Sequence, residues 1–462
     1  MRIACIHIPQ FALQSATRVD PTLRGAAVAV VSGVEPGREA AGVLHAPIVL
    51  ACSRLAWAHG VRIGMTATAA RLRSPEIQIV TADAATERET VRAIGDALLA
   101  IAPTVDLGGR VSTGGAHLAM YAEVPAKTRG AAFGERLLEL VDELGLTARI
   151  GIADDRFTAW VAAAHGAPIK EAPGTTPAAD ERGVIAVPRG GSAAFLAPRP
   201  LSLLAISPEV QHMLEALGVR TLGEFAALPA PSVARPLEAD YQALARGESD
   251  ATLRPYMPDA PIREEVTVSG GTVLELQDLL PAGEHAAGLS LPAAVALVAR
   301  RIAVRLAGRG RGAARLDIVA IAKDGAHEMP LTLDHGLEDA DELGHVIAPA
   351  LEAFAASHAE RGGAWRLRVV VSGEMVLGGE TTEIFAEGSR PHAALVARPV
   401  AQPIDPVAVV LASSGSLFSL SSPSLRAERR DAHRRTRRGK QRRMRPSAQA
   451  QPRLFDRMSS KA

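Results

Sequence analysis

The chain has 462 residues, of which 47% are apolar, and a net charge of +1 at neutral pH. This is enough apolar material for three or four small packed domains, as in a soluble globular protein. No run of about 18 apolar residues and no cleavable leader is found, so we expect neither a membrane span nor an export signal. The two cysteines, Cys5 and Cys52, lie in apolar stretches, which is typical of reduced thiols and excludes a disulfide framework or a zinc site.

Basic residues are concentrated near the C-terminus. Residues 426–445 contain eleven Lys or Arg against two acids, a net +9 that leaves the other residues at −8 because the whole chain is +1. Such a block repels itself, so it stays unpacked and is suited to neutralising phosphates. The alternative is a solvated tail that only aids solubility. The candidate phosphate-binding residues of this block are Arg434, Arg435, Arg437 and Arg438.

The first 153 residues alternate predicted strands and helices, which indicates an α+β unit. In chain order we expect a strand at 1–8, a sheet-edge strand at 26–31, a helix at 90–101, two strands within 105–120 around Gly108 and Gly109, a helix over 137–144 that ends at Gly145, and a strand at 147–153.

The rest of the chain divides into three segments. In residues 201–229, Gly218 can end one short helix and Thr221 can cap the next, which resembles half of a helix-hairpin-helix unit. Residues 264–374 follow the order βαββαβ, which is typical of a compact split-βαβ fold. Beyond 377 the chain is rich in Pro, Ser and Gly, so we expect no regular structure there.

Three short stretches resemble motifs of the Y-family translesion DNA polymerases. Residues 51–65 are similar to the family's stretch ending in Gly-Val-Arg-x-Gly-Met. Residues 112–119 stand where the family has Ser-x-Asp-Glu-Ala-Tyr-Leu-Asp, and residues 151–160 where it has Gly-x-Ala-x-Asn-Lys-x-x-Ala-Lys. The matching positions of the first stretch are Ser53, Gly60, Val61, Arg62, Gly64 and Met65.

This resemblance covers roughly residues 1–376 and implies a polymerase-like architecture. The implied parts are a palm at 1–165 with fingers inserted at about 15–75, a connection and helix-hairpin-helix-like thumb at 166–245, a little finger at 246–376, and a basic tail at 377–462.

The chain departs from the family where the chemistry would occur. Polymerisation needs acidic side chains that hold two magnesium ions about 4 Å apart. The corresponding positions here are His7, Gly114 and Gly115. Imidazole is a poor magnesium ligand and glycine has no side chain, so we interpret His7 as a core histidine and expect no metal, no cofactor and no enzymatic activity.

The nucleotide contacts of the family are also replaced. The Tyr and Arg that the family directs at the triphosphate correspond to Arg54 and Trp57, the phosphate-binding Lys to Trp160, and the aromatic residue that excludes ribonucleotides to Ala12. Arg54 is either a residual phosphate contact or a solvated surface residue.

DNA binding by charge is the property that the predicted little finger retains. Its arginines can follow backbone phosphates, although an ordinary charged surface is the alternative. The candidates are Arg300, Arg301, Arg305, Arg309, Arg311, Arg315, Arg366 and Arg368.

A short C-terminal stretch resembles the Gln-x-x-Leu-Phe peptide by which bacterial polymerases bind the sliding clamp. The matching residues are Gln451, Leu454 and Phe455. The stretch at 416–420 lacks the glutamine and is a weaker competitor.

A polymerase-like body without carboxylates most resembles the ImuB-like pseudo-polymerases of bacterial mutasomes. The resemblance implies a cytoplasmic, nucleoid-associated adaptor in damage-induced mutagenesis. Its implied partners are primer-template DNA, the sliding clamp, an ImuA-type RecA-like protein and an error-prone C-family DNA polymerase. One alternative is an active Y-family lesion-bypass polymerase with displaced metal ligands, for which Asp106, Asp154 and Asp155 are the candidates. Another is a helix-hairpin-helix nucleic-acid-binding protein unrelated to polymerases.

Overall fold

The computed structural model describes residues 1–33, 46–111, 116–166, 183–229, 236–249, 252–269, 289–359 and 364–376. All of these lie in one compact unit, Met1–Ala397. None of the helices in these ranges has the length and apolar character needed to cross a membrane.

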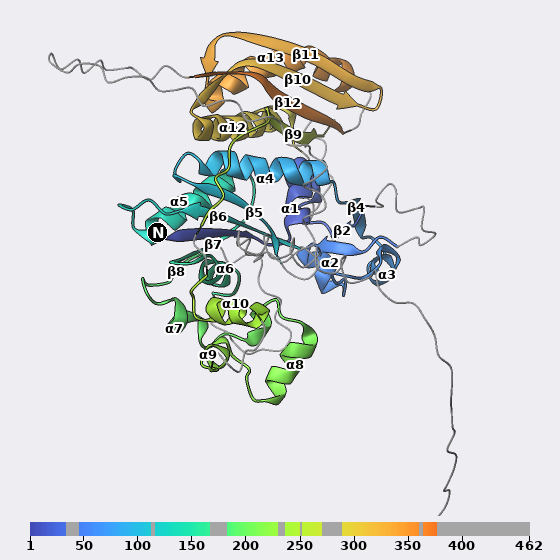
Figure 1. The fold of residues 1–462 in the computed structure, drawn as a ribbon. Coiled ribbons are helices and arrows are strands. Elements are labelled where there is room, and N and C mark those ends of the chain that lie inside the picture. Colours follow the sequence, from blue (N-terminus) through green and yellow to red (C-terminus); the bar gives the residue numbers. More distant parts are fainter. Residues whose placement is uncertain are drawn as a thin grey trace, which may run out of the picture. The chain divides into compact units, whose positions relative to one another are not determined.

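A five-stranded sheet forms the centre of the N-terminal region (Figure 1). Its central strand β1 is antiparallel to β6 on one side and to β7 on the other, and β7 is parallel to β8. All six residues of β1 are buried, as a strand between two packed layers requires. The sheet has the order β5 (Val105–Val111), β6 (His117–Glu123), β1 (Ile3–Ile8), β7 (Arg149–Ala153) and β8 (Gly183–Ala186).

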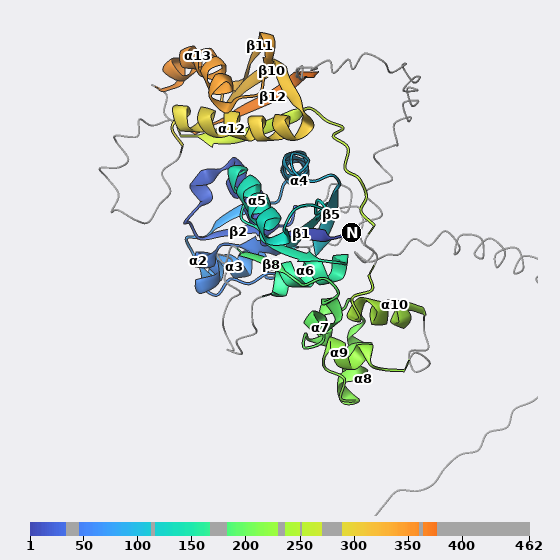
Figure 2. The same cartoon turned by 90° about the vertical axis from the view of Figure 1, so that its left-hand side faces the viewer.

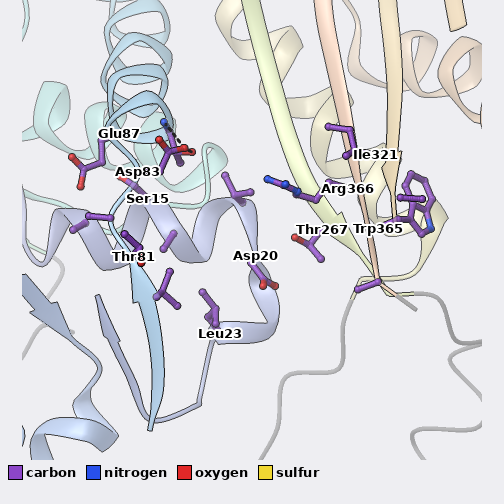
Figure 3. A pocket seen from close by; sticks show the side chains of 18 of the residues that line it. Ser15, Asp20, Leu23, Thr81, Asp83, Glu87, Thr267, Ile321, Trp365 and Arg366 are labelled. Atoms are coloured by element: carbon purple, nitrogen blue, oxygen red, sulfur yellow. Dashed lines mark hydrogen bonds between the residues drawn. The ribbon is translucent and has the colours of Figure 1, made fainter. Parts of the chain in front are cut away.

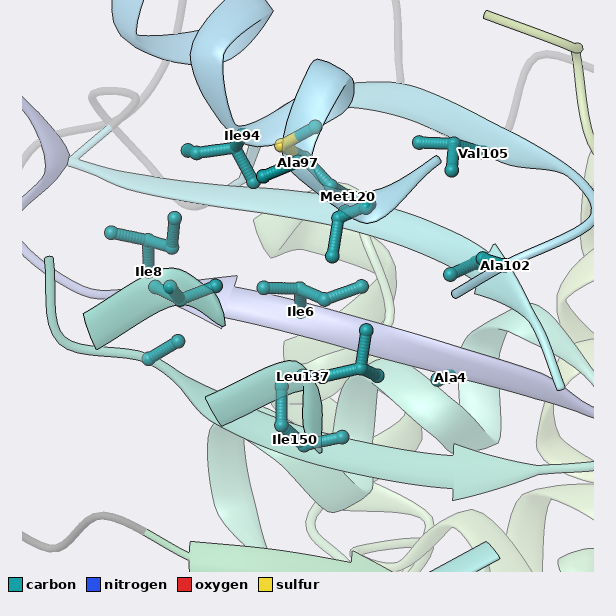
Figure 4. Close-up of a cluster of buried hydrophobic side chains, with 14 of the residues drawn as sticks. Ala4, Ile6, Ile8, Ile94, Ala97, Ala102, Val105, Met120, Leu137 and Ile150 are labelled. Atoms are coloured by element: carbon teal, nitrogen blue, oxygen red, sulfur yellow. The ribbon is translucent and has the colours of Figure 1, made fainter. Parts of the chain in front are cut away.

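Helices cover both faces of this sheet. Side chains of α4 (Ala84–Leu98) and α5 (Gly130–Glu143) pack on the face that carries Ile6 and Ile8, as Figure 4 shows for Ile94 and Leu137. The opposite face, with Ile3 and Cys5, packs against α6 (Arg156–His165). Burial of these apolar surfaces stabilises the region at about 25 cal/mol per Å².

Several elements of this region are as the sequence predicts. The strand at 1–8, the helix at 90–101 and the strand at 147–153 are confirmed as β1, α4 and β7. The helix over 137–144 is confirmed as α5, and Gly145 follows it with φ +78, a left-handed conformation that glycine adopts without a Cβ clash.

Two expectations about strands are confirmed only in part. Residues 26–31 do contain a strand, β2 (Val28–Val31), but it is the central strand of a separate three-stranded sheet and not an edge. The two strands expected within 105–120 are present as β5 and β6, but Gly108 and Gly109 lie inside β5 and not between the strands, at a point where the pairing with β6 shifts register. Gly108 has φ +59, and a Cβ there would lie 1.9 Å from the carbonyl oxygen of Ala119, so these glycines form a bulge that presses on the next strand.

The three-stranded sheet has the order β3-β2-β4, with β2 antiparallel to β3 and parallel to β4. A small core that includes Val31, Val49 and Ala70 joins this sheet to the neighbouring helices. The elements of this part are α1 (Phe11–Val19), the short 3-10 helix η1 (Pro21–Leu23), β3 (Val49–Cys52), α2 (Arg54–Ala58), α3 (Ala67–Arg73) and β4 (Gln78–Thr81).

In the described residues, short helices follow β8, and Figure 2 shows α7, α8, α9 and α10 gathered in one group. The expected break between two of them is confirmed, because Gly218 follows α8 with φ +87 and Thr221 caps α9 in a capping box with Glu224. The elements are α7 (Ser192–Leu196), the 3-10 helix η3 (Leu201–Leu203), α8 (Pro208–Ala216), α9 (Leu222–Ala226) and α10 (Pro236–Ala245).

The expected βαββαβ order over 264–374 is confirmed. The sheet has the order β11-β10-β12-β9 with every pair antiparallel, so β9 and β10 are parallel strands separated by β12, and β11 and β12 are parallel strands separated by β10. Both halves are thus split βαβ units. The elements are β9 (Ile262–Val268), α12 (Leu291–Arg309), β10 (Arg311–Ala322), β11 (Gly325–Leu337), α13 (Ala340–Ala359) and β12 (Trp365–Val376).

Candidate nucleic-acid interface

His7 lies in the middle of the five-stranded sheet, on the face that α6 covers. Its side chain is 5% exposed, and the centre of its ring is 5.2 Å from that of His117 on the neighbouring strand β6. The Nδ1 atom of His7 is buried without a hydrogen-bond partner. The interpretation of His7 as a core histidine is therefore in accord with its position.

The electrostatic surroundings keep the histidines of this site neutral. Burial, with smaller contributions from the neighbouring His117, His165 and Arg149, lowers the pKa of His7 to about 3. Burial, Arg199 and His117 lower the pKa of His165 to about 4. An uncharged imidazole supplies no negative charge to balance a magnesium ion.

No group of three or more His, Cys, Asp or Glu side chains able to hold a metal is found among the described residues. Gly114 and Gly115, the other two positions of the expected metal site, lie outside those residues.

Asp106, one candidate for a displaced metal ligand, is a buried structural carboxylate. It accepts hydrogen bonds from the Arg156 guanidinium at 2.7 Å and from the backbone amides of Gly108 at 2.8 Å and Arg254 at 3.0 Å. The Arg156 guanidinium also stacks 4.2 Å from the ring centre of Tyr121. These contacts use both carboxylate oxygens to hold β5, α6 and the segment after α10 together.

Asp154 and Asp155 are also engaged within the fold. Asp155 is the N-cap of α6 and accepts hydrogen bonds at 2.8 Å from the Thr158 amide and the Ser192 hydroxyl. Asp154 accepts a hydrogen bond from the Gly190 amide at 2.7 Å and pairs with Arg2. Both carboxylates join β7 to the segment around α7.

The residues at the expected nucleotide positions pack against neighbouring side chains. Trp57 is half-buried, with the Arg62 guanidinium 4.0 Å from its ring centre. Trp160 packs against Phe157 and His165, with ring centres 5.8 and 5.6 Å away.

Ala12 and Arg54 complete the nucleotide positions. Ala12 is buried at 2% exposure on α1, whereas Arg54 is exposed at the start of α2. Arg54 is therefore the most exposed of these four residues.

A cationic surface lies on the four-stranded sheet. Alternating residues of β9 and β12 point away from the apolar core, and the guanidinium groups of Arg263, Arg366 and Arg368 contact the single carboxylate of Glu265 at 3.0, 3.0 and 2.8 Å. Three cations share one anion, so this patch has a net charge of +2. We call Arg263, Glu265, Arg366 and Arg368 the arginine face.

The carboxylate of the arginine face is held in its charged form. Burial would raise the pKa of Glu265, but hydrogen bonds from Arg368 and Arg263 and the charges of Arg368 and Arg366 lower it overall. On the next strand, Arg315 is exposed and lies 3.5 Å from Asp317. Sequence analysis missed Arg263, although the even-numbered apolar residues Ile262, Val266 and Val268 would have placed it on the opposite, outward face of the strand.

The candidates on α12 divide into two groups. Arg300 on α12 and Arg311 at the start of β10 are exposed. Arg301 and Arg305 are fully buried and Arg309 is 6% exposed, so the expectation that these three contact phosphates needs correction for this structure. They share the helix face that packs against α4 and α1, where their partners are carboxylates and a carbonyl group of the protein itself.

A cavity of about 530 Å³ lies between α1, β4, the start of α4 and the ends of β9, β10 and β12 (Figure 3). Its lining combines the acids Asp20, Asp83 and Glu87 with the bases Lys323 and Arg366. The acids would repel phosphates, so we assign no nucleic-acid contact to the side of this cavity formed by α1, β4 and α4, whereas Arg366 also belongs to the arginine face.

The expected DNA-binding tail residues and clamp-binding residues lie outside the described residues. They are Arg434, Arg435, Arg437, Arg438, Gln451, Leu454 and Phe455.

Comparison with known proteins gives one family match, in the region that contains the five-stranded and three-stranded sheets. Residues 6–164 match the impB/mucB/samB family. The DNA polymerase IV proteins of two strains of Dehalococcoides mccartyi are 36% and 35% identical to this chain over 89 residues. These alignments span 19% of this chain and about a fifth of the length of each relative.

Solved structures with similar architecture include an insertion ternary complex of Dbh DNA polymerase, with a TM-score of 0.44 and 16% identity over 80% of this chain and 98% of that one. DinB from Sulfolobus solfataricus has a TM-score of 0.42 and 14% identity over 82% of this chain and 100% of that one. With the family match and the mixed α and β content, the expected Y-family polymerase-like fold is confirmed.

Proposed function

We propose that this chain is a non-catalytic, DNA-binding adaptor in translesion synthesis and damage-induced mutagenesis. In this proposal residues 1–165 are a palm with fingers at about 15–75, residues 166–245 a connection and thumb, residues 246–376 a little finger, and residues 377–462 a tail that binds partners. The match of residues 6–164 to the impB/mucB/samB family supports the assignment of the palm and fingers.

The observation that carries the proposal is the state of His7. A two-metal polymerase site needs negative charge on the central strand. Here that strand presents a buried imidazole whose pKa is lowered to about 3, next to a second histidine. Asp106 and Asp155 cannot substitute without releasing the hydrogen bonds that hold their own segments.

Nucleic-acid binding is assigned to the arginine face, together with Arg300, Arg311 and the basic tail. The arginine face lies on strands, and its excess positive charge is suited to phosphates without reading base sequence. Binding should therefore be sequence-tolerant and fall steeply with salt.

An active polymerase binds primer-template DNA more tightly when the complementary nucleotide is present, whereas a non-catalytic adaptor does not. Binding of a dideoxy-terminated fluorescent primer-template would be measured by anisotropy with Mg²⁺, with and without the deoxynucleotide complementary to the template. We expect equal DNA affinity in both conditions, because Trp57 and Trp160 stand where the family contacts the triphosphate. Tighter binding with the complementary nucleotide alone would favour the alternative, an active polymerase with displaced metal ligands.

The proposed partners are the sliding clamp, an ImuA-type RecA-like protein and an error-prone C-family DNA polymerase. For the clamp, the double variant Leu454→Ala/Phe455→Ala is compared with wild type by surface plasmon resonance on immobilised clamp. Truncation of two anchors typically costs about 2 kcal/mol each, so we expect binding to be lost. Equal clamp affinities would remove the clamp from this proposal.

A further inference from the structure

Three arginines spaced by four residues line one face of α12. Arg301, Arg305 and Arg309 are at i, i+4 and i+8, which places them on the same side of the helix. This side packs against α4 of the N-terminal region, and the contact is close enough to exclude any side chain at Gly308. A Cβ at Gly308 would lie 1.8 Å from the carbonyl oxygen of Asp96.

Arg305 is the centre of a buried ionic cluster. Its guanidinium contacts the carboxylates of Asp96 and Glu264 at 2.9 Å and of Glu89 at 2.8 Å. Asp96, Glu264 and Arg305 are all fully buried. Because Asp96 and Glu89 belong to α4 and Glu264 belongs to β9, this one guanidinium connects the N-terminal region to the four-stranded sheet.

Further groups extend the cluster on both sides. Asp96 also accepts hydrogen bonds at 2.9 Å from Arg309 and from the Tyr256 hydroxyl. Glu264 accepts a hydrogen bond at 2.6 Å from Arg18 of α1. Tyr256 therefore attaches the segment before β9 to α4, and Glu264 attaches the four-stranded sheet to α1.

Among the described residues Arg301 has no carboxylate within 4 Å, unlike Arg18, Arg305 and Arg309. It is fully buried and donates one hydrogen bond, at 3.0 Å, to the carbonyl oxygen of Arg18. Its Nε and second terminal nitrogen are buried without a hydrogen-bond partner. Burial and the nearby charge of Arg18 lower the pKa of Arg301, because both disfavour the charged form of its guanidinium group.

The charge of Glu264 acts favourably on Arg301 but leaves two of its buried nitrogens unpaired, which destabilises the packed arrangement, whereas a phosphate group would satisfy these donors. The cluster therefore combines strong ionic contacts at Arg305 with one unsatisfied cation at Arg301. The contacts of Arg305 stabilise the closed interface, whereas Arg301 would gain a phosphate partner if the interface opened.

We propose that this cluster is an ionic latch that holds the four-stranded sheet and its helices on the N-terminal region and conceals Arg301 and Arg305 from nucleic acid. Opening of the latch exposes both guanidinium groups, which then bind backbone phosphates. The second part rests on the DNA-binding function proposed above, whereas the latch itself does not.

Two variants open the latch by independent means. Gly308→Ala places a methyl group against the backbone of α4 and leaves every charge in place. Asp96→Asn/Glu264→Gln removes the two buried negative charges and leaves the shape nearly unchanged. The control is Gly344→Ala on α13, where the new Cβ would have its nearest neighbour at an ordinary 4.0 Å.

The first measurement is the distance between the two regions, by double electron–electron resonance on the full chain. Spin labels are attached to cysteines introduced at the exposed positions Arg136 on α5 and Thr332 on β11. Cys5 and Cys52 are buried, so labelling is directed to the new sites. We expect a single narrow distance in wild type and Gly344→Ala, and a longer, broader distribution in both latch variants, with unchanged circular dichroism.

The second measurement is primer-template affinity as a function of salt. Each added phosphate contact makes the slope of log K against log salt steeper by about 0.9, so Gly308→Ala should bind DNA more tightly with a slope steeper by about two. Adding Arg301→Gln/Arg305→Gln to Gly308→Ala should abolish this gain.

The outcomes separate the two proposals. Distances unchanged in both latch variants would overturn the latch, and so would loss of secondary structure in both, because the cluster would then be part of a single core. A distance increase without tighter DNA binding would overturn the concealment of Arg301 and Arg305. Absence of DNA binding by wild type and all variants would instead overturn the proposed function.

Discussion

The two sheet regions of this protein differ in what their polar residues do. Around the five-stranded sheet, polar groups are buried in the protein: His7 packs beside His117, and Asp155 at the start of α6 accepts a hydrogen bond from Ser192. In the four-stranded sheet, Arg263, Arg366 and Arg368 face outward around a single carboxylate. The comparison suggests that the first region is retained as a packed scaffold and the second as a binding surface.

The hydrophobic cores of the two sheet regions should be equally well packed. Ile6 and Ile318 are both fully buried, each in the core of its own sheet. Truncation of a buried isoleucine to alanine typically costs about 2–5 kcal/mol, so Ile6→Ala and Ile318→Ala should each destabilise their region by this amount. Hydrogen exchange of the flanking strands in urea measures the two regions separately.

The control for the core variants is Leu72→Ala, because Leu72 is 81% exposed and its truncation should have little effect. A loss near zero for Ile6→Ala would mean that the five-stranded sheet is not the well-packed scaffold described here.

Removal of the arginine face should weaken DNA binding next most strongly. The triple variant Arg263→Ala/Arg366→Ala/Arg368→Ala loses three cations, so we expect affinity to fall about 100-fold at moderate salt and the salt slope to become shallower by up to about three. Fluorescence anisotropy with a primer-template measures both quantities. Arg136→Ala, on the exposed surface of α5, is the matched control. An unchanged slope in the triple variant would show that DNA binds elsewhere.

The buried His7 should make stability depend on pH. Its pKa is lowered to about 3, against about 6.5 in an unfolded chain, so the unfolded state binds more protons in acid. Stability is therefore unaffected by His7 above pH 6.5 and falls as the pH drops toward the folded value, by on the order of 1–2 kcal/mol at pH 5. His165 is exposed, so solvent reduces its share of this effect.

Chemical denaturation of wild type and His7→Leu between pH 7.5 and 5 tests the effect of the histidines. The variant should lose part of the acid sensitivity, whereas His345→Gln, at an exposed position of α13, should keep all of it. Parallel stability curves for wild type and His7→Leu would contradict the assignment of His7 as a neutral buried group.

A smaller effect of opposite sign is expected from Glu265→Gln. The carboxylate partly neutralises three arginines, and exposed ion pairs are worth about 0.2–1 kcal/mol, so its removal should raise DNA affinity by about two- to fivefold. Weaker binding would mean that Glu265 orients the arginines more than it neutralises them.

The sequence predicts helices and strands well where short-range patterns, such as apolar periodicity and capping residues, determine their position. Leucines at helical spacing before Gly145, and the cap at Thr221, specify α5 and α9 without help from distant residues. Gly108 and Gly109 were expected to separate two strands but lie at a bulge within β5, because a glycine pair is equally typical of a strand break and of a bulge. The close approach of Gly108 to Ala119 is visible only in three dimensions.

Side-chain roles at the candidate site depend on long-range contacts and were harder to predict. Arg301 and Arg305 have the residue type and spacing of phosphate-binding arginines, and the sequence does not show which surface α12 faces. Asp96, which pairs with Arg305, is 209 residues away in the chain. His7 was predictable as a core residue because apolar residues surround it along β1.

Primer extension with simultaneous measurement of DNA binding tests the central claim most directly. Purified full-length protein is mixed with a labelled primer-template and all four deoxynucleotides, with Mg²⁺ or Mn²⁺, and His7→Asp/Gly114→Asp/Gly115→Glu is assayed beside it. We predict that both proteins bind the DNA and that neither extends the primer, because the variant still has Arg54, Trp57 and Trp160 at the nucleotide positions. Template-dependent addition of nucleotides by the wild-type protein would contradict the account.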